Sequence, residues 1–210
     1  MFPSLYAILD PALIEVPLAE FAAKLAAAGV GLIQLRDKRA SARRLLEETR
    51  GLIVLFTSTS VRLVVNDRPD VAAMAGAGGV HVGQEDLPVE AARAICGTGR
   101  WVGISTHNLA QLREAAGTSA DYIAVGPIFP TATKQNPDPV VGIDFLREAR
   151  KLTRKPLVAI GGITIESAAD IFRAGADSVA VIRDLAAAPD PAQRARDYLA
   201  VAKVSRSGPA

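Results

Sequence analysis

Eight short apolar runs recur along the chain, and each is followed by a longer amphipathic segment. The runs are three to five residues long, and most are β-branched and apolar on both faces. That pattern is typical of buried parallel strands covered by helices. The predicted strands are Leu5–Leu9, Gly31–Leu35, Arg62–Val65, Val80–Val82, Trp101–Ile104, Tyr122–Val125, Leu157–Ile160 and Ser178–Ile182.

The amphipathic segments predict eight helices. Several begin at a proline or at a capping residue, and Asn108, Asp144 and Thr164 are the expected caps. Ala-Gly pairs end three of them, which favours left-handed helix stops at Gly29 and at two further glycines of the same kind. The predicted helices are Pro17–Ala28, Ala42–Phe56, Pro69–Ala77, Val89–Ala94, Leu109–Ala116, Ile143–Leu152, Ile165–Ala174 and Pro191–Val201.

Eight strands that alternate with eight helices predict an α/β fold, a single (β/α)8 TIM barrel. A doubly wound open sheet is the alternative, but it usually carries a Gly-rich dinucleotide turn after its first strand. Here the first run continues instead as Asp10-Pro11-Ala12. The length of 210 residues suits one such domain. We expect it to span residues 1–204, with a frayed tail over 205–210.

Charge and composition exclude several classes of function. The formal net charge is only +2 and no Lys/Arg block occurs, so we expect no nucleic-acid partner. Cys96 is the single cysteine, which excludes an internal disulfide and fits a reducing compartment. No apolar stretch reaches membrane-spanning length, and no secretory signal is recognisable. We therefore expect a cytoplasmic protein without a membrane partner; its oligomeric state is open, with a homodimer as one possibility.

Polar clusters follow the apolar runs. In a barrel of this kind the carboxyl ends of all strands surround one mouth, where the active site lies. We therefore expect the clusters to face a common site. They are Gln34–Lys38, Asn66–Asp67, Gln84–Asp86, Ser105–His107, Gly126–Lys134, Gly161–Ile163 and Arg183–Asp184.

Three cations and two carboxylates stand out among these clusters. Arg36, Lys38 and Lys134 can converge at the mouth, and Asp67 and Asp86 follow neighbouring strands. Mg²⁺ takes oxygen ligands, commonly one or two carboxylates together with substrate phosphates. The pattern therefore predicts a diphosphate held by Lys and Arg and by Mg²⁺.

Neutral groups predict a second phosphate site. Gly161 and Gly162 precede a helix with Thr164 as its expected cap, so their backbone N–H groups are placed to bind phosphate. Thr131 and Thr133 add hydroxyl donors. The remaining neutral hydrogen-bonding groups are Gln34, Asn66, His81 and Ser105. Together the clusters predict a site for two phosphorylated partners.

Each cluster also has a purely structural interpretation. Asn66-Asp67 is also a common turn sequence. The glycine pair also permits close packing, and His81 lies between two valines, as a core histidine would. The functional interpretation depends on the coincidence that nearly every predicted strand ends in a polar cluster.

Six of these motifs, in this order, resemble the thiamine phosphate synthase family. Each is weak alone, but six in order at barrel spacing are specific, and they cover most of the chain. They are Gln34–Lys38, Asn66–Asp67, His81–Asp86, Gly103–His107, Gly126–Lys134 and Gly161–Ile163.

The resemblance implies a transferase that joins hydroxymethylpyrimidine diphosphate to hydroxyethylthiazole phosphate, forms a C–N bond and releases pyrophosphate. Mg²⁺ is the implied cofactor, and the two small molecules are the implied partners. The resemblance implies diphosphate and pyrimidine contacts at Gln34, Arg36, Lys38 and Asn66, Mg²⁺ ligands at Asp67 and Asp86, contacts to the departing diphosphate at Ser105 and Lys134, and thiazole-phosphate contacts at Thr131, Thr133 and Gly162.

One position departs from the family pattern. Members often end the eighth strand in Ile-Ser, where the serine helps to hold the thiazole phosphate, whereas this chain has Ile182-Arg183. Backbone donation can persist there, and arginine is itself a good phosphate partner. We count Ile182 and Arg183 as substrate-binding residues and leave the role of the arginine open.

The implied reaction has a dissociative path, in which the aminopyrimidine ring stabilises a methylene cation as diphosphate leaves. Preorganised cations stabilise the leaving charge, and no protein nucleophile is needed. Three rivals are a thiazole tautomerase acting through His107, a non-catalytic sensor of thiamine precursors, and another phosphate-binding barrel enzyme. An aldolase among the last class would need a desolvated lysine on a strand, and the predicted strands contain none.

Overall fold

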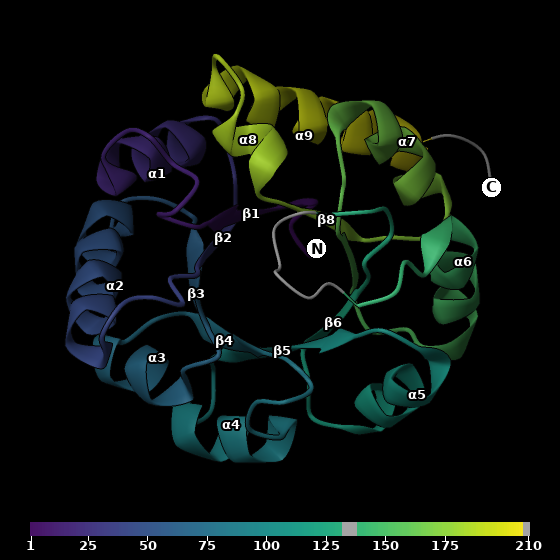
Figure 1. The fold of residues 1–210 in the computed structure, drawn as a ribbon, viewed down its shortest axis with the longest axis horizontal. Coiled ribbons are helices and arrows are strands. Elements are labelled where there is room, and N and C mark those ends of the chain that lie inside the picture. The colour runs from purple at the N-terminus through teal and green to yellow at the C-terminus, as the bar shows by residue number, and fades with distance from the viewer. Residues whose placement is uncertain (132–137, 208–210) are drawn as a thin grey trace.

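The computed structural model describes residues 1–131 and 138–207, and within them eight parallel strands close into a barrel (Figure 1). Each strand pairs with its neighbours in sequence, and β1 pairs with β8, with Leu5 opposite Val179. The strands are β1 (Leu5–Leu9), β2 (Leu32–Leu35), β3 (Arg62–Asn66), β4 (Gly79–Val82), β5 (Trp101–Thr106), β6 (Tyr122–Val125), β7 (Leu157–Ile160) and β8 (Ser178–Val181). The predicted (β/α)8 barrel is confirmed.

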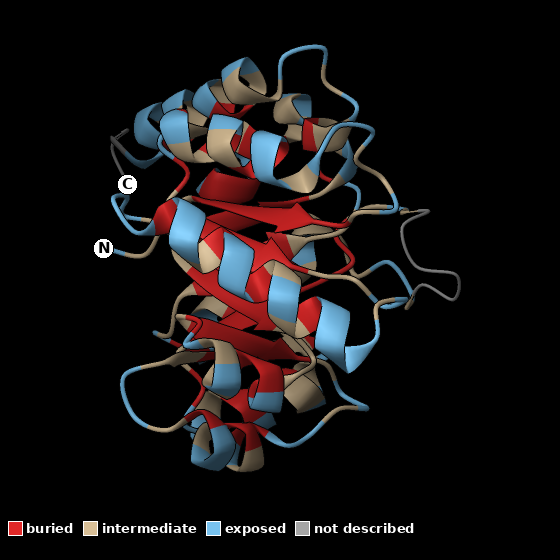
Figure 2. Cartoon of the chain, turned by 90° about the vertical axis from the view of Figure 1, so that its left-hand side faces the viewer, coloured by how far each residue is buried: buried red, intermediate tan, exposed pale blue. Residues whose placement is uncertain are grey.

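Helices form a ring around the strands (Figure 1), and their outward faces are exposed while the strands are buried (Figure 2). The last helix, α9, packs against α7 and α1 and so helps to close the ring. The helices are α1 (Leu18–Ala27), α2 (Ala42–Phe56), α3 (Pro69–Ala75), α4 (Val89–Cys96), α5 (Leu109–Gly117), α6 (Gly142–Leu152), α7 (Ile165–Arg173), α8 (Arg183–Ala186) and α9 (Pro191–Ser207).

The strands separate two apolar layers because successive side chains point to opposite faces of the sheet. In β1, Leu5, Ala7 and Leu9 belong to the large core between strands and helices. Tyr6 and Ile8, which alternate with them, belong to the smaller core inside the barrel. This alternation decides which strand residues can reach the mouth.

The predicted helix stops and two of the three predicted caps are confirmed. Gly29 and the corresponding glycines at positions 76 and 175 all have positive φ. Asn108 is the N-cap of α5 and accepts from the Gln111 backbone N–H at 3.0 Å, and Thr164 is the N-cap of α7. Asp144 is not a cap, because α6 begins two residues earlier, after Val141.

Two features near the C-terminus differ from the expectations. The four-residue helix α8 follows β8 directly and was not predicted. Helix α9 continues to Ser207, so part of the segment expected to fray is helical. Among the described residues no helix is both long enough and apolar enough to cross a bilayer.

Candidate active site

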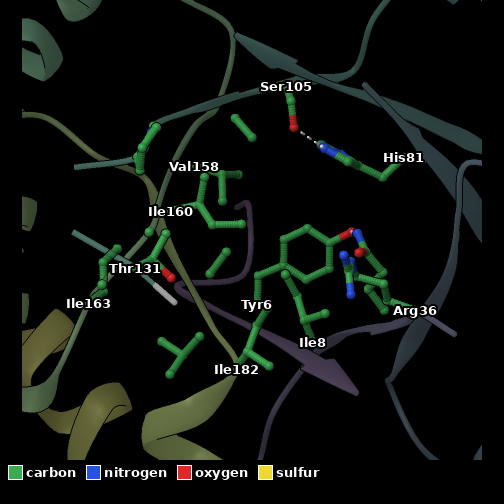
Figure 3. Close-up of a pocket in the computed structure, with 18 of the residues that line it drawn as sticks. Tyr6, Ile8, Arg36, His81, Ser105, Thr131, Val158, Ile160, Ile163 and Ile182 are labelled. Atoms are coloured by element: carbon green, nitrogen blue, oxygen red, sulfur yellow. Dashed lines mark hydrogen bonds between the residues drawn. The ribbon is translucent and has the colours of Figure 1, made fainter. Parts of the chain in front are cut away.

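A cavity opens at the carboxyl ends of the strands (Figure 3), and every strand or the loop directly after it contributes to the lining. It holds about 1030 Å³ of space between side chains, counting the part that opens to solvent. One part of the wall is apolar, with side chains of β1, β7 and the loops after β7 and β8: Ile8, Val158, Ile160, Ile163 and Ile182. Polar groups of the neighbouring strands complete the wall, so the cavity suits a small heterocycle with charged substituents.

Arg36 enters this cavity just after β2 and is fixed by Asp10, just after β1. One Arg36 guanidinium nitrogen lies 2.5 Å from the Asp10 carboxylate, and both side chains are largely buried. Asp10 also accepts from the Ala12 backbone N–H at 3.0 Å. The arginine is therefore held in one orientation before any ligand binds.

Two carboxylates and a lysine form a second group beside Asn66. Lys38 Nζ lies 3.1 Å from the Asp67 carboxylate. Burial raises the pKa of Asp67, and the neighbouring Asp86 carboxyl raises it further, by a hydrogen bond and by charge repulsion, while Lys38 opposes the shift. Adjacent carboxylates of this kind favour a bound cation.

Local backbone geometry places these carboxylates. Asp67 has a φ of 61°, a left-handed conformation that is uncommon for a residue with a Cβ. Its backbone N–H donates to the His81 carbonyl at 2.7 Å. Asp86 accepts from the Gly83 backbone N–H at 2.7 Å. Both carboxylates are thus held by the ends of β3 and β4.

Hydrogen bonds cross the barrel interior below the cavity. Gln34 Nε2 donates to the Tyr6 hydroxyl at 2.6 Å, and the hydroxyls of Tyr6 and Tyr122 are 2.9 Å apart. His81 Nδ1 lies 3.1 Å from the Tyr122 hydroxyl, and His81 Nε2 lies 2.9 Å from Ser105 Oγ (Figure 3). His81 is therefore both a buried histidine and a cavity-lining one, which joins the two interpretations that the sequence left open.

Gly161 and Gly162 line the cavity and also permit close packing. A Cβ on Gly161 would lie 2.5 Å from the Pro127 side chain, and one on Gly162 would lie 2.5 Å from the Pro130 carbonyl. The loop after β6 thus rests directly on the loop after β7. Among the described residues, none accepts a hydrogen bond from the Gly162 N–H.

The short helix α8 borders the cavity on the β8 side, with Ile182 and Arg183 among the lining residues. Asp184 anchors it to α9, because its carboxylate accepts from Arg194 at 2.8 and 2.9 Å and from the Tyr198 hydroxyl at 2.7 Å. Burial raises the pKa of the Tyr198 phenol, and the Asp184 carboxylate raises it further. The position of this helix is therefore set by α9.

His107 lies after β5 and also lines the cavity. Its Nδ1 lies 2.6 Å from the Gly126 carbonyl oxygen, so this nitrogen carries the proton. Its Nε2 lies 3.4 Å from the Asp138 carboxylate. These contacts tie the loop after β6 to the end of β5.

Most of the residues expected in the site from the sequence converge here. The cavity is lined by Gln34, Arg36, Asn66, Ser105, Thr131, Gly162, Ile182 and Arg183. Lys38, Asp67 and Asp86 form the adjacent group and are not part of the lining. Thr133 and Lys134 lie outside the described residues.

The sequence interpretation missed Tyr6, Ile8 and Asp10. All three lie on or just after β1 at alternate positions, so the period of two predicts that they face the interior with Tyr6 deepest. Tyr6 and Ile8 lie within the strand and Asp10 stands alone after it, so none of them belongs to a polar cluster of the kind that predicted the other site residues.

Comparison with known proteins gives a consistent result. The family model described as thiamine monophosphate synthase matches residues 5–185. A thiamine-phosphate synthase of Koribacter versatilis is 52% identical over 204 residues, covering 95% of each chain. That of Chloroflexus aurantiacus is 44% identical over 178 residues, covering 85% of this chain and 82% of the relative.

Solved structures agree. Thiamine phosphate pyrophosphorylase from Pyrococcus furiosus superposes with a TM-score of 0.88 at 32% identity, covering 96% of each chain. The enzyme of that name from Bacteroides thetaiotaomicron has a TM-score of 0.70 at 17% identity, which supports the fold alone. From the family model and from relatives that match along nearly the whole chain, this chain belongs to the thiamine monophosphate synthase family.

Proposed function

We propose that this chain condenses 4-amino-2-methyl-5-hydroxymethylpyrimidine diphosphate with 4-methyl-5-(2-hydroxyethyl)thiazole phosphate. The products are thiamine phosphate and pyrophosphate. The observation that carries the proposal is that Arg36, fixed by Asp10, lines a cavity with an apolar wall, while the Lys38–Asp67–Asp86 group follows the same and the next strands beside it. Fixed cations suit a diphosphate, as does a metal ion held by paired carboxylates, and the apolar wall suits a planar ring.

The carboxylate pair fits Mg²⁺. Two adjacent oxygen donors, one with a raised pKa and the second hydrogen-bonded to a backbone N–H, provide the donor set that this ion prefers. Asp67 and Asp86 would hold the ion, which would neutralise charge on the leaving diphosphate. Among the described residues no group of three or more acidic, His or Cys side chains forms a metal site, so substrate oxygens would complete the coordination.

The chain's own residues bind and orient the pyrimidine diphosphate. Arg36 donates to the diphosphate, and Asp10 holds the guanidinium in place. Gln34 uses one N–H on Tyr6, and among the described residues its Oε1 has no hydrogen-bond donor. This oxygen is placed to accept from the exocyclic amine of the ring. Lys134 is the further cation expected from the sequence, outside the described residues.

The second substrate would lie on the β6–β8 side of the cavity, where Thr131 lies across from Arg36 (Figure 3). The Gly162 N–H and the start of α8 would bind its phosphate, as is common after strands seven and eight of this fold. Apolar side chains such as Ile8 and Ile160 would exclude water from the methylene carbon.

The reaction balances without a protein base. The bond between the methylene carbon and the diphosphate oxygen breaks, and its electron pair leaves with pyrophosphate. The thiazole nitrogen then donates its lone pair to the methylene carbon and becomes the thiazolium nitrogen. Arg36, Lys38 and Ser105 stabilise the leaving negative charge as preorganised donors.

The test is a coupled measurement of pyrophosphate release and thiamine phosphate formation. Both should require both substrates and Mg²⁺ and should appear in equal amounts. Asp67→Asn should lower turnover at limiting Mg²⁺ about a hundredfold. Asp70→Asn, which removes an exposed carboxylate of α3 paired with Arg68, is the matched control and should retain turnover.

Pyrophosphate release from the pyrimidine diphosphate alone would show a hydrolase and refute the proposal. If folded protein released no pyrophosphate, the next assay would measure thiazole isomerisation by the wild type and by His107→Asn, because His107 also lines the cavity.

A further inference from the structure

A continuous chain of side-chain hydrogen bonds connects two opposite parts of the cavity lining. It starts at Gln34 on β2, passes through the hydroxyls of Tyr6 and Tyr122, reaches His81 on β4 and ends at Ser105 on β5. The four distances are 2.6, 2.9, 3.1 and 2.9 Å. Tyr6 and Tyr122 are almost fully buried.

The chemistry of the members sets the direction of this chain. The Gln34 amide nitrogen can only donate, so the Tyr6 oxygen accepts and its own hydrogen goes to Tyr122. Tyr122 then donates to His81 Nδ1. A neutral imidazole that accepts at Nδ1 carries its hydrogen on Nε2, which donates to Ser105 Oγ. The Ser105 hydrogen is left for a ligand in the cavity.

With the Gln34 amide nitrogen facing Tyr6, the opposite direction leaves a defect. If Ser105 donated to His81, then Tyr122 would donate to Tyr6, which also accepts from Gln34. The Tyr6 hydrogen would then lack an acceptor among these partners, inside the barrel, and an unpaired buried donor destabilises the fold. Burial raises the pKa of both phenols, so both stay protonated and both hydrogens must be placed.

The fold makes room for this chain. Gly103 on β5 pairs with His81 on β4, and a Cβ on Gly103 would lie 2.0 Å from the Tyr122 ring. The Tyr122 ring stacks on the His81 ring, with centroids 5.5 Å apart and planes 22° apart. A phenylalanine would fill the same volume, so the tyrosine hydroxyl matters only for the hydrogen bonds.

We propose that Tyr6, Tyr122 and His81 are positioning residues that hold Ser105 as a hydrogen-bond donor to the leaving diphosphate. The identity of the acceptor rests on the proposed function, whereas the direction of the chain does not. Because buried hydrogen-bond chains polarise each member, removing one hydroxyl weakens the donor at the far end. None of the three needs to touch the substrate for this role.

The first test reads the direction of the chain without turnover. The protein has two histidines, so long-range ¹H–¹⁵N spectra contain two imidazole rings, and His107→Asn assigns them. At a pH about two units above the ordinary imidazole pKa of about 6.5, His81 should be the Nε2–H tautomer. His107 should be the Nδ1–H tautomer, because its Nδ1 faces a carbonyl oxygen. An Nδ1–H tautomer at His81 would overturn the proposal.

Tyrosine variants test the chain in the same spectra. Tyr122→Phe should shift His81 Nδ1 and leave the His107 nitrogens unchanged. Tyr198→Phe removes a third buried phenol hydroxyl, on α9, and should leave both rings unchanged. Unchanged His81 signals in folded Tyr122→Phe would refute the connection.

The second test uses inorganic pyrophosphate with Mg²⁺ as the probe, by calorimetry. Ser105→Ala and Tyr122→Phe should each weaken binding about tenfold, and the double variant should lose no more than Ser105→Ala alone. Tyr6→Phe, which breaks the chain one bond earlier, should have a smaller effect and serves if Tyr122→Phe does not fold. Thr49→Val, which removes a buried hydroxyl within α2, should bind normally. Additive losses in the double variant would contradict the proposal.

Failure of the proposed function has a different signature. If no thiamine phosphate formed but the His81 tautomer and the pyrophosphate results held, the chain of positioning residues would stand and the substrate assignment would fall.

Discussion

At the scale of single residues, the proposed function makes the Asp10–Arg36 pair the one with the most direct effect on substrate binding. Asp10→Asn should raise the KM for the pyrimidine diphosphate about tenfold, because a hydrogen bond to a charged group contributes about 1.5–3 kcal/mol to holding the guanidinium. Steady-state kinetics with the second substrate saturating would measure this. Glu20→Gln, in an exposed pair with Lys24, is the control. A lower KM in Asp10→Asn would mean that relief of repulsion between Asp10 and the diphosphate outweighs positioning.

The raised pKa of Asp67 predicts how stability depends on pH. Between the unfolded-state pKa near 3.8 and the higher folded-state pKa, the folded protein binds more protons than the unfolded chain. Stability is therefore lost as pH rises through that window. Asp67→Asn removes the loss, so in metal-free buffer near neutral pH its Tm should exceed that of the wild type.

Two controls separate this effect from others. The Tm advantage of Asp67→Asn should shrink as pH falls through this window and should vanish below about 3.8, where the wild-type carboxyl becomes protonated in both states. Added Mg²⁺ should raise the Tm of the wild type and not that of the variant. An Asp67→Asn protein that is less stable than the wild type at every pH would contradict the assigned shift.

Single residues also mark the limit of what sequence patterns predict. Polar clusters after strands predicted Gln34, Arg36, Asn66 and Ser105 because position along one strand suffices to place a side chain at the mouth. The Tyr6–Tyr122 contact joins residues 116 positions apart, and no local period encodes which interior side chains meet. Such contacts depend on barrel register, which only the closed structure fixes.

At the scale of elements, four of the predicted strands and helices have the expected bounds at both ends, namely β1, β6, β7 and α2. The others shift by one or a few residues at their ends, most at α9, whose end was predicted at Val201 although the Gly208-Pro209 stop signal comes later in the sequence. Helix α8 escaped prediction because four residues are too few to show a period of 3.6. Asp184 holds α8 against α9 as a separate short helix, because its carboxylate accepts hydrogen bonds from Arg194 and Tyr198.

Loop aspartates at the amino ends of strands predict a stability effect that is separate from activity. Asp177, just before β8, accepts from the Leu157 backbone N–H at 2.8 Å and from Arg150 at 2.8 Å. Asp121, just before β6, bonds the Val102 N–H in the same way. Asp177→Ala should reduce the free energy of unfolding by about 2 kcal/mol, because it strands a buried N–H.

Chemical denaturation would measure this loss. The turnover of folded Asp177→Ala should match the wild type, because the site lies at the other ends of the strands. Asp170→Ala, which breaks an exposed pair with Arg173 on α7, should change stability by less than about 0.5 kcal/mol. A large loss of turnover with little loss of stability would show that this end of the barrel also shapes the site.

At the scale of the whole molecule, closure divides the barrel into the face with the candidate active site and an opposite face to which we assign a role in stability alone. The cavity, the carboxylate pair and α8 lie at the carboxyl ends of the strands. Met1 and the end of α9 lie together on the opposite face, since Arg206 contacts both the Met1 sulfur at 4.0 Å and the Asp177 carbonyl at 2.6 Å. This proximity permits a circular permutation.

Two permutants, each joining Ser207 to Met1 by a short linker, test the division. New ends between Thr98 and Gly99 open an exposed loop between α4 and β5, on the amino-terminal face of the strands. This protein should fold and keep kcat within about threefold, because permutation at an exposed loop is usually tolerated.

New ends between Gln84 and Glu85 open the turn that holds Asp86 on the Gly83 N–H. This second permutant should fold as well, because the same strands still pair. Its turnover should fall about a hundredfold, as expected when a preorganised charge is released. Circular dichroism and cooperative unfolding would establish folding, and thiamine phosphate formation would report activity. Equal activity in both permutants would show that the turn after β4 does not need to be fixed, and that Asp86 binds no ion essential to turnover.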